Sequence, residues 1–372
     1  MRHRQFFWMG IFVCLVSIWS VFFSFLYEKD VDVASAAGPI TWDGGAGDSD
    51  WCSALNWSTD AVPTSTSDVT INSVVTVITT GCIDGGVNFN SLTLGGAAAS
   101  VLQLSKNIGS GGDITINSSG VLEQMTAVTQ TITGSLIVAN GGILRHGTNN
   151  ATQDYEVDFS ATTIDIQVGG SVNVDYRGYA SGQGPGTAAT GSWGSGASHA
   201  GNGALGSSGK VPGNGYCTLH DVSTMGSGGG KGNNGSAAGG PGGGYIKLQA
   251  SGTLTINGTI TSDGKTAGTT YGGGGAGGGI KLIADTIAGT PTSFTAHAGN
   301  GSHASGSSGG GGGCVQLNYT TANSITAAGI SVYGGSVYAI GGAGSIFIQQ
   351  NGTNGDLTIK NTSAGAGRIF LR

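Results

Sequence analysis

The run GGGGAGGGIKL at residues 272–282 places seven glycines among eight residues, directly before a short apolar segment. Similar units, each a glycine-rich run that ends in an apolar segment, recur at 239–248, 309–317 and 341–348. The first apolar residues of the four units are spaced 34, 35 and 31 positions apart: Ile246, Ile280, Val315 and Ile346. Self-similarity at a nearly constant period indicates a solenoid, because one such unit is too small to bury a core alone.

A shorter repeat occupies residues 69–178. Short runs rich in Val, Ile, Leu and Thr, bounded by Gly, Asn or Ser, are typical of strands, and they lie at 69–71, 87–94, 113–117, 135–139 and 163–168. Within them Leu92, Ile114 and Leu136 follow one another at steps of 22. In a parallel β-helix each strand pairs with its copy in the next coil, about 4.8 Å away. The sequence therefore predicts an all-β solenoid with coils of about 22 residues in this part.

Glycine accounts for 74 of the 372 residues, and two interpretations of the glycine-rich runs compete. They could be flexible linkers, or they could be turns on one side of the solenoid, where glycine permits close approach of the backbone. The second is favoured because each run ends directly in an apolar strand. Residues 179–238 hold few apolar runs and predict one long glycine-rich loop that projects from a corner.

The composition excludes several classes of protein. Only 9% of the residues are charged and the net charge is -6, which gives no electrostatic footprint for nucleic acid. A helical bundle is disfavoured, because glycine costs about 1 kcal/mol at an interior helix position.

The N-terminus determines the predicted compartment. Residues 5–27 are almost wholly apolar, with Arg2 and Arg4 before them and acidic residues after them, a pattern that favours an inside N-terminus. As a helix they would span about 34 Å, enough to cross a bilayer. Two alternatives stay open: a retained signal anchor, or a secretory signal peptide (residues 1–36) cut after Ala36. Both predict that the rest of the chain lies outside the cytoplasm, anchored to the membrane or secreted to the cell surface.

The cysteines agree with an oxidising compartment. Four of the five lie beyond the apolar span, an even number: Cys52, Cys82, Cys217 and Cys314. Of the three possible pairings we favour Cys52–Cys82 with Cys217–Cys314, because each pair would connect a loop to the same local region. Four unpaired thiols are the alternative.

The domain organisation follows from these patterns. Residues 37–68 are predicted to be an N-terminal cap, in which three tryptophans cover the first open coil: Trp42, Trp51 and Trp57. The 22-residue coils fill 69–178, the projecting loop 179–238, and coils of about 31–35 residues 239–372. Because GAGRIFLR at 365–372 looks like the start of another unit, the solenoid is predicted to be truncated at the C-terminus.

The opening segment TWDGGAGDSDWCSALNW at 41–57, with Pro63 after it and the two repeats beyond, carries a resemblance. It resembles bacterial secreted and cell-surface glycine-rich proteins with a right-handed parallel β-helix of the pectin-lyase-like type, autotransporter passengers among them. The resemblance implies a right-handed solenoid over residues 40–372, which would follow the one N-terminal apolar helix predicted from residues 5–27. It does not determine the activity, since that superfamily holds polysaccharide lyases, glycoside hydrolases and adhesins.

One group of residues is a candidate for catalysis. Asp154, Glu156 and Asp158 would share one face of a strand, and Arg177 is a possible basic partner; paired carboxylates are what glycoside hydrolysis requires. The alternative, the solvated polar face of a strand, is favoured. The opening loop offers a candidate calcium site at Asp43, Asp48 and Asp50, because calcium takes oxygen ligands. Capping and turn-forming aspartates are the favoured alternative there.

We therefore predict an extracytoplasmic, surface-displayed structural or adhesive β-solenoid, an adhesin that contacts carbohydrate or protein on the cell envelope or on another extracellular surface. A polysaccharide lyase or glycoside hydrolase on the same scaffold is the alternative. An ice-binding solenoid is a third hypothesis, based on three Thr-x-Thr pairs, at 131–133, 253–255 and 259–261.

Overall fold

The computed structural model describes residues 39–82, 86–268 and 270–361. These residues are all-β, and their helical content is limited to three 3-10 turns: η1 (Ala54–Asn56), η2 (Asn233–Gly235) and η3 (Ala327–Gly329). None of their helices has the length and apolar character to cross a membrane. The predicted apolar helix at 5–27, the signal segment 1–36 and the further unit at 365–372 lie outside the described residues.

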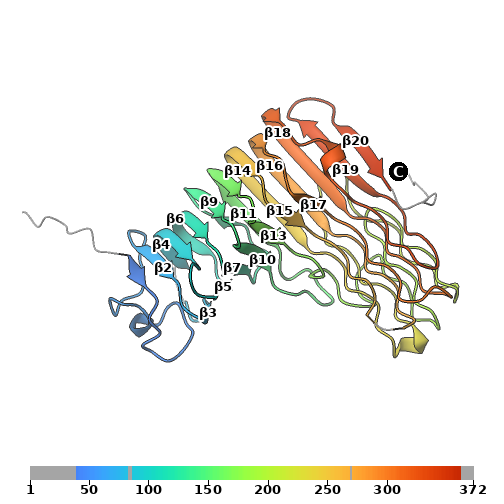
Figure 1. The fold of residues 1–372 in the computed structure, drawn as a ribbon, viewed down its shortest axis with the longest axis horizontal. Helices are drawn as coiled ribbons and strands as arrows, with labels where there is room; N and C mark the ends of the chain where they lie inside the picture. The colour runs from blue at the N-terminus through green and yellow to red at the C-terminus, as the bar shows by residue number, and fades with distance from the viewer. Residues whose placement is uncertain (1–38, 83–85, 269, 362–372) are drawn as a thin grey trace, which may run out of the picture. The chain divides into compact units, whose positions relative to one another are not determined.

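The larger of two sheets has thirteen strands stacked coil on coil (Figure 1). Its main path is β1 (Ile40–Thr41), β2 (Asp68–Ile71), β4 (Val87–Leu94), β6 (Ile108–Ile116), β9 (Ser135–Val138), β12 (Thr163–Ile166), β14 (Tyr245–Ile256), β16 (Gly279–Ala288), β18 (Cys314–Asn323), β19 (Gly344–Gln350) and β20 (Asp356–Lys360). β11 (Val157–Ala161) pairs with β14, and β8 (Gln130–Thr131) pairs with β11. Every pair in this sheet is parallel except β19–β20, which is antiparallel.

In this sheet, the residues that recur in the sequence are paired with one another on neighbouring strands. Leu92 pairs with Ile114, and Ile114 with Leu136. In the longer coils the partners run in the order Ile246, Ile280, Val315 and Ile346. All of these side chains are buried, because alternate residues of a strand point to the same face and this face is the core. The predicted parallel stacking of both repeats is therefore confirmed.

The smaller sheet closes the other side of the coils. Its seven parallel strands are β3 (Val75–Ile78), β5 (Ser100–Leu104), β7 (Gly120–Gln124), β10 (Ile143–His146), β13 (Ser171–Asn173), β15 (Thr259–Thr261) and β17 (Ser293–Thr295). Leu102, Leu122 and Leu144 occupy equivalent positions in it and are fully buried. They belong to the same apolar cluster as the inward residues of the larger sheet, so one continuous core fills the coils.

The N-terminal segment of the described chain is a cluster of aromatic rings. The Trp42 and Trp51 rings each meet the Trp57 ring edge-on, with centroids 5.1 and 4.7 Å away. The Trp57 indole donates to the Trp51 carbonyl at 2.7 Å. All three side chains are buried in the core, and the Cys52–Cys82 disulfide joins this segment to the chain after β3. The tryptophans thus pack into the first coil, as a cap requires.

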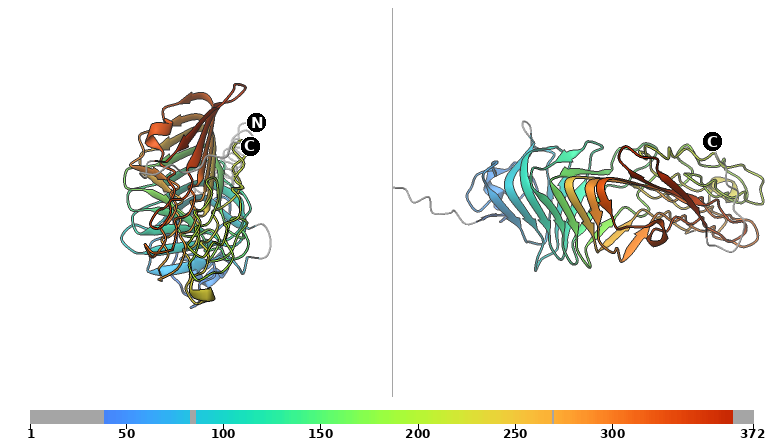
Figure 2. Two further views of the ribbon diagram at one scale, coloured as in Figure 1. Left: turned by 90° about the vertical axis from the view of Figure 1, so that its right-hand side faces the viewer. Right: turned by 90° about the horizontal axis from the view of Figure 1, so that it is seen from above.

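The glycine-rich segments 178–244, 264–279, 297–313 and 333–344, called the glycine layer below, run together beside the strands (Figures 1 and 2). Their hydrogen bonds recur every third residue: Gly274 N donates to Ser308 O, and Gly277 N donates to Gly311 O, at 2.9 and 3.0 Å. The preceding segment is joined to this one at the same interval, through Gly240 N to Gly273 O and Gly243 N to Ala276 O. A period of three, with backbone bonds to neighbouring chains, is typical of polyproline II helices.

In the runs 272–279 and 309–313 of this layer, glycine is required for close approach, and not for an unusual φ. The glycines of 272–279 and 309–313 all lie outside the left-handed φ region. A Cβ placed on Gly277 would overlap the carbonyl of Ala296 and the amide nitrogen of Gly313. The runs are therefore neither flexible linkers nor simple turns: they are packed segments whose backbones touch.

Residues 179–238 belong to the glycine layer and do not project as the sequence predicts. Ala197 N donates to Gly274 O at 3.0 Å, Gly229 N donates to Gly240 O at 2.8 Å, and residues 194–199 and 225–230 are buried. The prediction equated a lack of apolar side chains with exposure. A glycine run can instead satisfy its buried N–H and C=O groups through its neighbours.

One part of this segment crosses the outer face of the larger sheet. Within residues 216–226, called the crossing segment below, Val222 N donates to the Gln316 side chain of β18 at 2.9 Å, and Val222 O accepts from the Tyr245 hydroxyl at 2.8 Å. Val222 and Met225 are buried in a second apolar cluster with Tyr245 and Cys314. The structure pairs Cys217 with Cys314, so a disulfide attaches the crossing segment to β18.

Candidate functional site

The three candidate catalytic acids do not lie on one strand. Asp158 lies in β11, whereas Asp154 and Glu156 precede that strand. Asp154 is exposed and accepts from the Thr152 hydroxyl at 2.7 Å; Glu156 accepts from the Gln153 amide at 2.9 Å. Burial, with a smaller contribution from the Asp158 charge, raises the pKa of Glu156.

Asp158 is held in a buried ion pair. Its Oδ2 lies 3.0 Å from Lys247 Nζ of β14 and accepts from the Thr129 hydroxyl at 2.7 Å, while its Oδ1 has no hydrogen-bond partner. Only 6% of the Asp158 side chain is exposed, so the carboxylate depends on the lysine for its charge compensation. A group that is buried and paired in this way serves the packing of neighbouring coils.

Arg177, the predicted basic partner, bonds to a different acid. Its Nη1 lies 3.3 Å from Glu123 Oε1 and donates to the His146 carbonyl at 2.7 Å. Arg145 Nε approaches the same Glu123 oxygen at 2.8 Å, and Gln103 donates to the other oxygen at 2.7 Å. Glu123 is 8% exposed. The predicted set is therefore split between the larger sheet and the smaller one, and Arg177 completes a structural cluster.

His146 lies beneath this cluster and makes a testable contribution to stability. It is fully buried, its Nδ1 lies 2.6 Å from the Gly147 carbonyl, and its Nε2 accepts from Tyr245 N at 3.2 Å. Burial, chiefly, lowers the pKa of His146 to about 3. Between pH 6.5 and 3 the unfolded chain binds a proton that the folded chain does not, so this group's contribution to stability is lost as the pH falls.

The change His146→Gln is expected to reduce the acid sensitivity of the protein. From pH 7 to pH 5 the wild type should lose about 2 kcal/mol more unfolding free energy than the variant, as one unfolded-state histidine protonates. Urea denaturation at both pH values measures this difference, and His199, present in both proteins, cancels. Parallel pH profiles for the two proteins would show that His146 is protonated in the folded state.

A second row of ionisable groups lies at the ends of the smaller sheet's strands, where Asp175, Asp263 and His297 occupy equivalent places in three coils. Asp175 Oδ1 accepts from Asp263 N at 2.7 Å, and Asp263 Oδ1 accepts from His297 N at 2.6 Å. Burial is the largest cause of the raised pKa of both carboxyls. The His297 ring stacks on Tyr333, with centroids 5.1 Å apart. Sequence reasoning missed this row, although aligning VNVD, TITSD and FTAH by coil would have found it.

The aspartates of the predicted calcium site are used in the turns of their own loop. Asp48 accepts from Asp50 N, Ser53 Oγ and the Asn56 amide, at 2.6–2.9 Å, and these bonds lower the pKa of Asp48. Asp43 accepts from Gly45 N, and Asp50 from Cys52 N. Among the residues that the structure describes, the carboxylates of Asp43, Asp48 and Asp50 do not lie close enough together to share one metal ion. They act as turn-forming residues.

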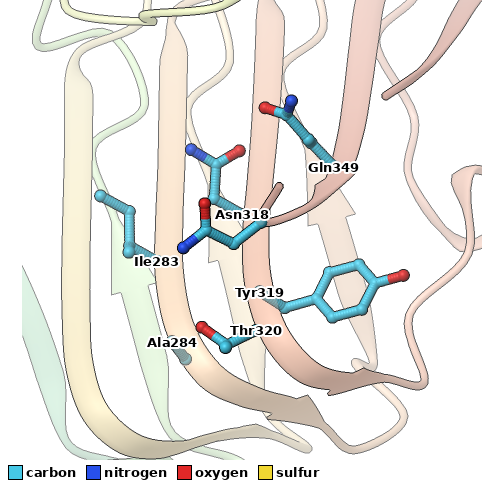
Figure 3. Close-up of a pocket in the computed structure, with 7 residues that line it drawn as sticks. Ile283, Ala284, Asn318, Tyr319, Thr320 and Gln349 are labelled. Atoms are coloured by element: carbon cyan, nitrogen blue, oxygen red, sulfur yellow. The ribbon is translucent and has the colours of Figure 1, made fainter. Parts of the chain in front are cut away.

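A cavity of about 180 Å³ opens on the larger sheet, between β16, β18 and β19 (Figure 3). It is lined by Ile283, Ala284, Asn318, Tyr319, Thr320, Gln349 and Asn351. Amides and hydroxyls dominate this lining, which holds no carboxylate, imidazole, thiol or amine. The cavity can hydrogen-bond a neutral polar group, and Tyr319 is the one ionisable side chain of its lining.

Three aromatic side chains meet at one end of the glycine layer. The Trp193 ring centroid lies 4.6 Å from that of Tyr271 and 5.1 Å from that of His303, and the Tyr271 and His303 rings stack at 6.0 Å. Each is partly exposed. Trp193, Tyr271 and His303 are called the aromatic cluster below. The sequence analysis missed the cluster, because its members come from three separate glycine-rich segments.

The Thr-x-Thr pairs that suggested ice binding lie on three different strands. Thr131 ends β8, Thr253 and Thr255 belong to β14 of the larger sheet, and the 259–261 pair forms β15 of the smaller sheet. Comparisons with protein-family models, curated proteins and solved structures found no significant match to this chain.

Proposed function

We propose that this protein is an extracytoplasmic, surface-displayed β-solenoid with a structural and adhesive role, which contacts carbohydrate. In this proposal the coils wind in the right-handed sense, and residues 5–27 form an apolar helix that anchors the chain or belongs to a cleaved signal peptide. The two disulfides support an oxidising location. Its partners would be saccharides or proteins of a cell envelope.

The proposal is supported chiefly by how the acidic side chains of the coils are paired and buried. Glu123 is compensated by two arginines and Asp158 by a lysine, and both acids are almost fully buried. A catalytic acid must be accessible to the substrate, and its carboxyl group must lie within hydrogen-bond reach of the substrate atom that gives or takes the proton. Acids that are enclosed and paired instead fasten one coil to the next, as a rod that displays a surface requires.

The row of Asp175 and Asp263 favours a second candidate function, a polysaccharide hydrolase. Equivalent residues in neighbouring coils lie about 4.8 Å apart, close to the carboxylate separation of about 5–5.5 Å in retaining glycosidases. Tyr176, beside them, is 46% exposed and has a left-handed φ of 63°. Because each carboxylate already accepts a backbone N–H from the next coil, this function ranks second.

A depolymerisation assay separates the two functions. The full chain is incubated with pectin, alginate and hyaluronan, and the length of the polymer, together with new reducing or unsaturated ends, is measured. For an adhesive rod we expect polymers of unchanged length and retention of the protein on at least one immobilised polysaccharide. Asp158→Asn, Asp175→Asn and Asp263→Asn serve as comparison variants. Chain cleavage that disappears in one of them would establish an enzyme and overturn the proposal.

A further inference from the structure

The aromatic cluster stands where the glycine layer is farthest from the strands. Asn233 N and Asn234 N, in η2, donate to the carbonyls of Ser192 and Gly191, each at 2.9 Å. Figure 1 shows η2, in olive-yellow, at the far end of the layer. Trp193 follows Ser192 directly, so the packed glycine segments hold the cluster at their outer end.

The cluster packs against the glycine layer and presents polar atoms to solvent. A Cβ on Gly306 would overlap the Trp193 ring, so the indole packs closely against that backbone. His303 Nδ1 accepts from Ser305 N at 3.2 Å. Among the described residues, the indole N–H, the Tyr271 hydroxyl and His303 Nε2 have no hydrogen-bond partner. Partly exposed rings with unused polar edges combine apolar contact area with hydrogen-bonding capacity at little entropic cost.

The part of the chain that contains the cluster carries a positive net charge, unlike residues 39–175. Residues 39–175 hold two basic and 13 acidic residues, a net charge of -11, whereas residues 176–355 hold six basic and three acidic residues, a net charge of +3. The backbones of two of these basic residues, Lys210 and Lys231, adjoin the segment that contains Trp193, and the Lys231 side chain runs along Gly182. The Lys210 stem packs on Gly191, its carbonyl accepts from the Ser195 hydroxyl, and Lys231 O accepts from Gly191 N at 3.1 Å. Cations near the rings favour a ligand that carries negative charge.

We propose that the aromatic cluster is a binding site for an acidic polysaccharide. The inference rests on the proposed function and names the site and the ligand class through which the adhesive rod would act. The rings of Trp193 and Tyr271 contact the apolar C–H faces of sugar rings. The indole N–H, the Tyr271 hydroxyl and the His303 imidazole form hydrogen bonds with sugar hydroxyls. Lys210 and Lys231 attract the carboxylate or sulfate groups of the polysaccharide.

Tryptophan fluorescence tests this site directly. Trp42, Trp51 and Trp57 are buried, so Trp193 is the one partly exposed tryptophan among the described residues. Hyaluronan, alginate and polygalacturonate are titrated into the full chain, with dextran as the neutral comparison. We expect a saturable fluorescence change with the acidic polymers, an at least tenfold weaker response to dextran, and loss of the change in Trp193→Phe, which keeps an aromatic ring for packing.

Binding to the immobilised polymers provides the second measurement. We expect Trp193→Ala and Tyr271→Ala to weaken binding at least tenfold, and Lys210→Gln with Lys231→Gln to weaken it about threefold or more at low salt. Leu55→Ala, which removes an exposed apolar side chain from η1, is the control and should bind as the wild type does. The melting temperature of every variant is measured, so that loss of binding by unfolding is recognised.

The outcomes distinguish this inference from the proposed function. If the wild type binds acidic polysaccharide and the folded Trp193 and Tyr271 variants bind equally well, the site is wrong and the adhesive function stands. If dextran binds as tightly as the acidic polymers, the ligand class is wrong. If the wild type binds none of these polymers, both the inference and the carbohydrate contact of the proposed function fail.

Discussion

Replacing Gly277 with alanine is expected to destabilise the protein by about 3 kcal/mol. The new methyl group would overlap the carbonyl of Ala296 and the amide of Gly313, both of which are backbone groups. These cannot rotate aside as a side chain can, and Gly277 N is itself bonded to Gly311 O at 3.0 Å. Relief of the overlap therefore requires neighbouring segments to separate, which breaks hydrogen bonds in a buried layer.

Thermal denaturation followed by circular dichroism measures this effect. We expect the melting temperature to fall by about 5–10 °C in Gly277→Ala. Gly329→Ala is the matched control, because nothing lies within 4 Å of a Cβ at Gly329 and its φ lies outside the left-handed region. Equal melting temperatures for the two variants would contradict the close packing of the glycine layer.

Removal of the Cys217–Cys314 disulfide should have a still larger effect. The two cysteines are 97 positions apart, and the chain-entropy relation assigns about 4.7 kcal/mol to a loop of that length. The bond also holds the crossing segment on β18, where Gln316 Nε2 donates to His220 O at 2.9 Å. Without the bond, the buried Val222 and Met225 would leave the sheet more easily.

Urea denaturation of Cys217→Ser/Cys314→Ser gives the size of the effect, and faster hydrogen exchange at the Val222 amide gives its location. Cys52→Ser/Cys82→Ser is the comparison: its cysteines are 30 positions apart, and the same relation gives about 3.6 kcal/mol. Which of the two double variants loses more unfolding free energy is the more informative result. A smaller loss for the 217–314 pair would indicate that the crossing segment is held without its disulfide.

The strands and their register could be predicted because they depend on the type of side chain at each position, which is visible in the sequence. Ile246, Ile280, Val315 and Ile346 point into one core, so the same residue type is needed at the same place in each coil, and the spacing is visible in the sequence. The tryptophan cluster of the first coil was visible for the same reason. The structure also contains the favoured disulfide pairing, in which each pair joins neighbouring structure.

The glycine layer could not be predicted, because its contacts lie between backbones. Nothing in the residue types states that Ala197 bonds to Gly274 or that Gly229 bonds to Gly240. The candidate site was missed for a related reason. Trp193, Tyr271 and His303 are single aromatic residues in glycine- and serine-rich runs, and only the pairing of those runs brings the rings together. A weak signal existed, since Trp193 and Tyr271 each directly precede a glycine.

Strand alternation predicts which acidic residues share a face, but it does not predict which neighbouring side chains cover that face. Asp158 faces outward from β11, yet Lys247 of the neighbouring strand β14 and Thr129 enclose it. Arg177, the possible basic partner of those acids, lies beside Glu123 instead.

The three-residue period of the glycine layer constrains how related chains can differ in length. A single inserted residue would rotate all later N–H groups of its segment away from their acceptors. Three inserted residues add one helical turn, about 9 Å of length, and restore the pattern if the adjoining segments lengthen equally. Tolerated insertions in homologues are therefore expected in matched multiples of three, and each such step would move the aromatic rings outward by one turn.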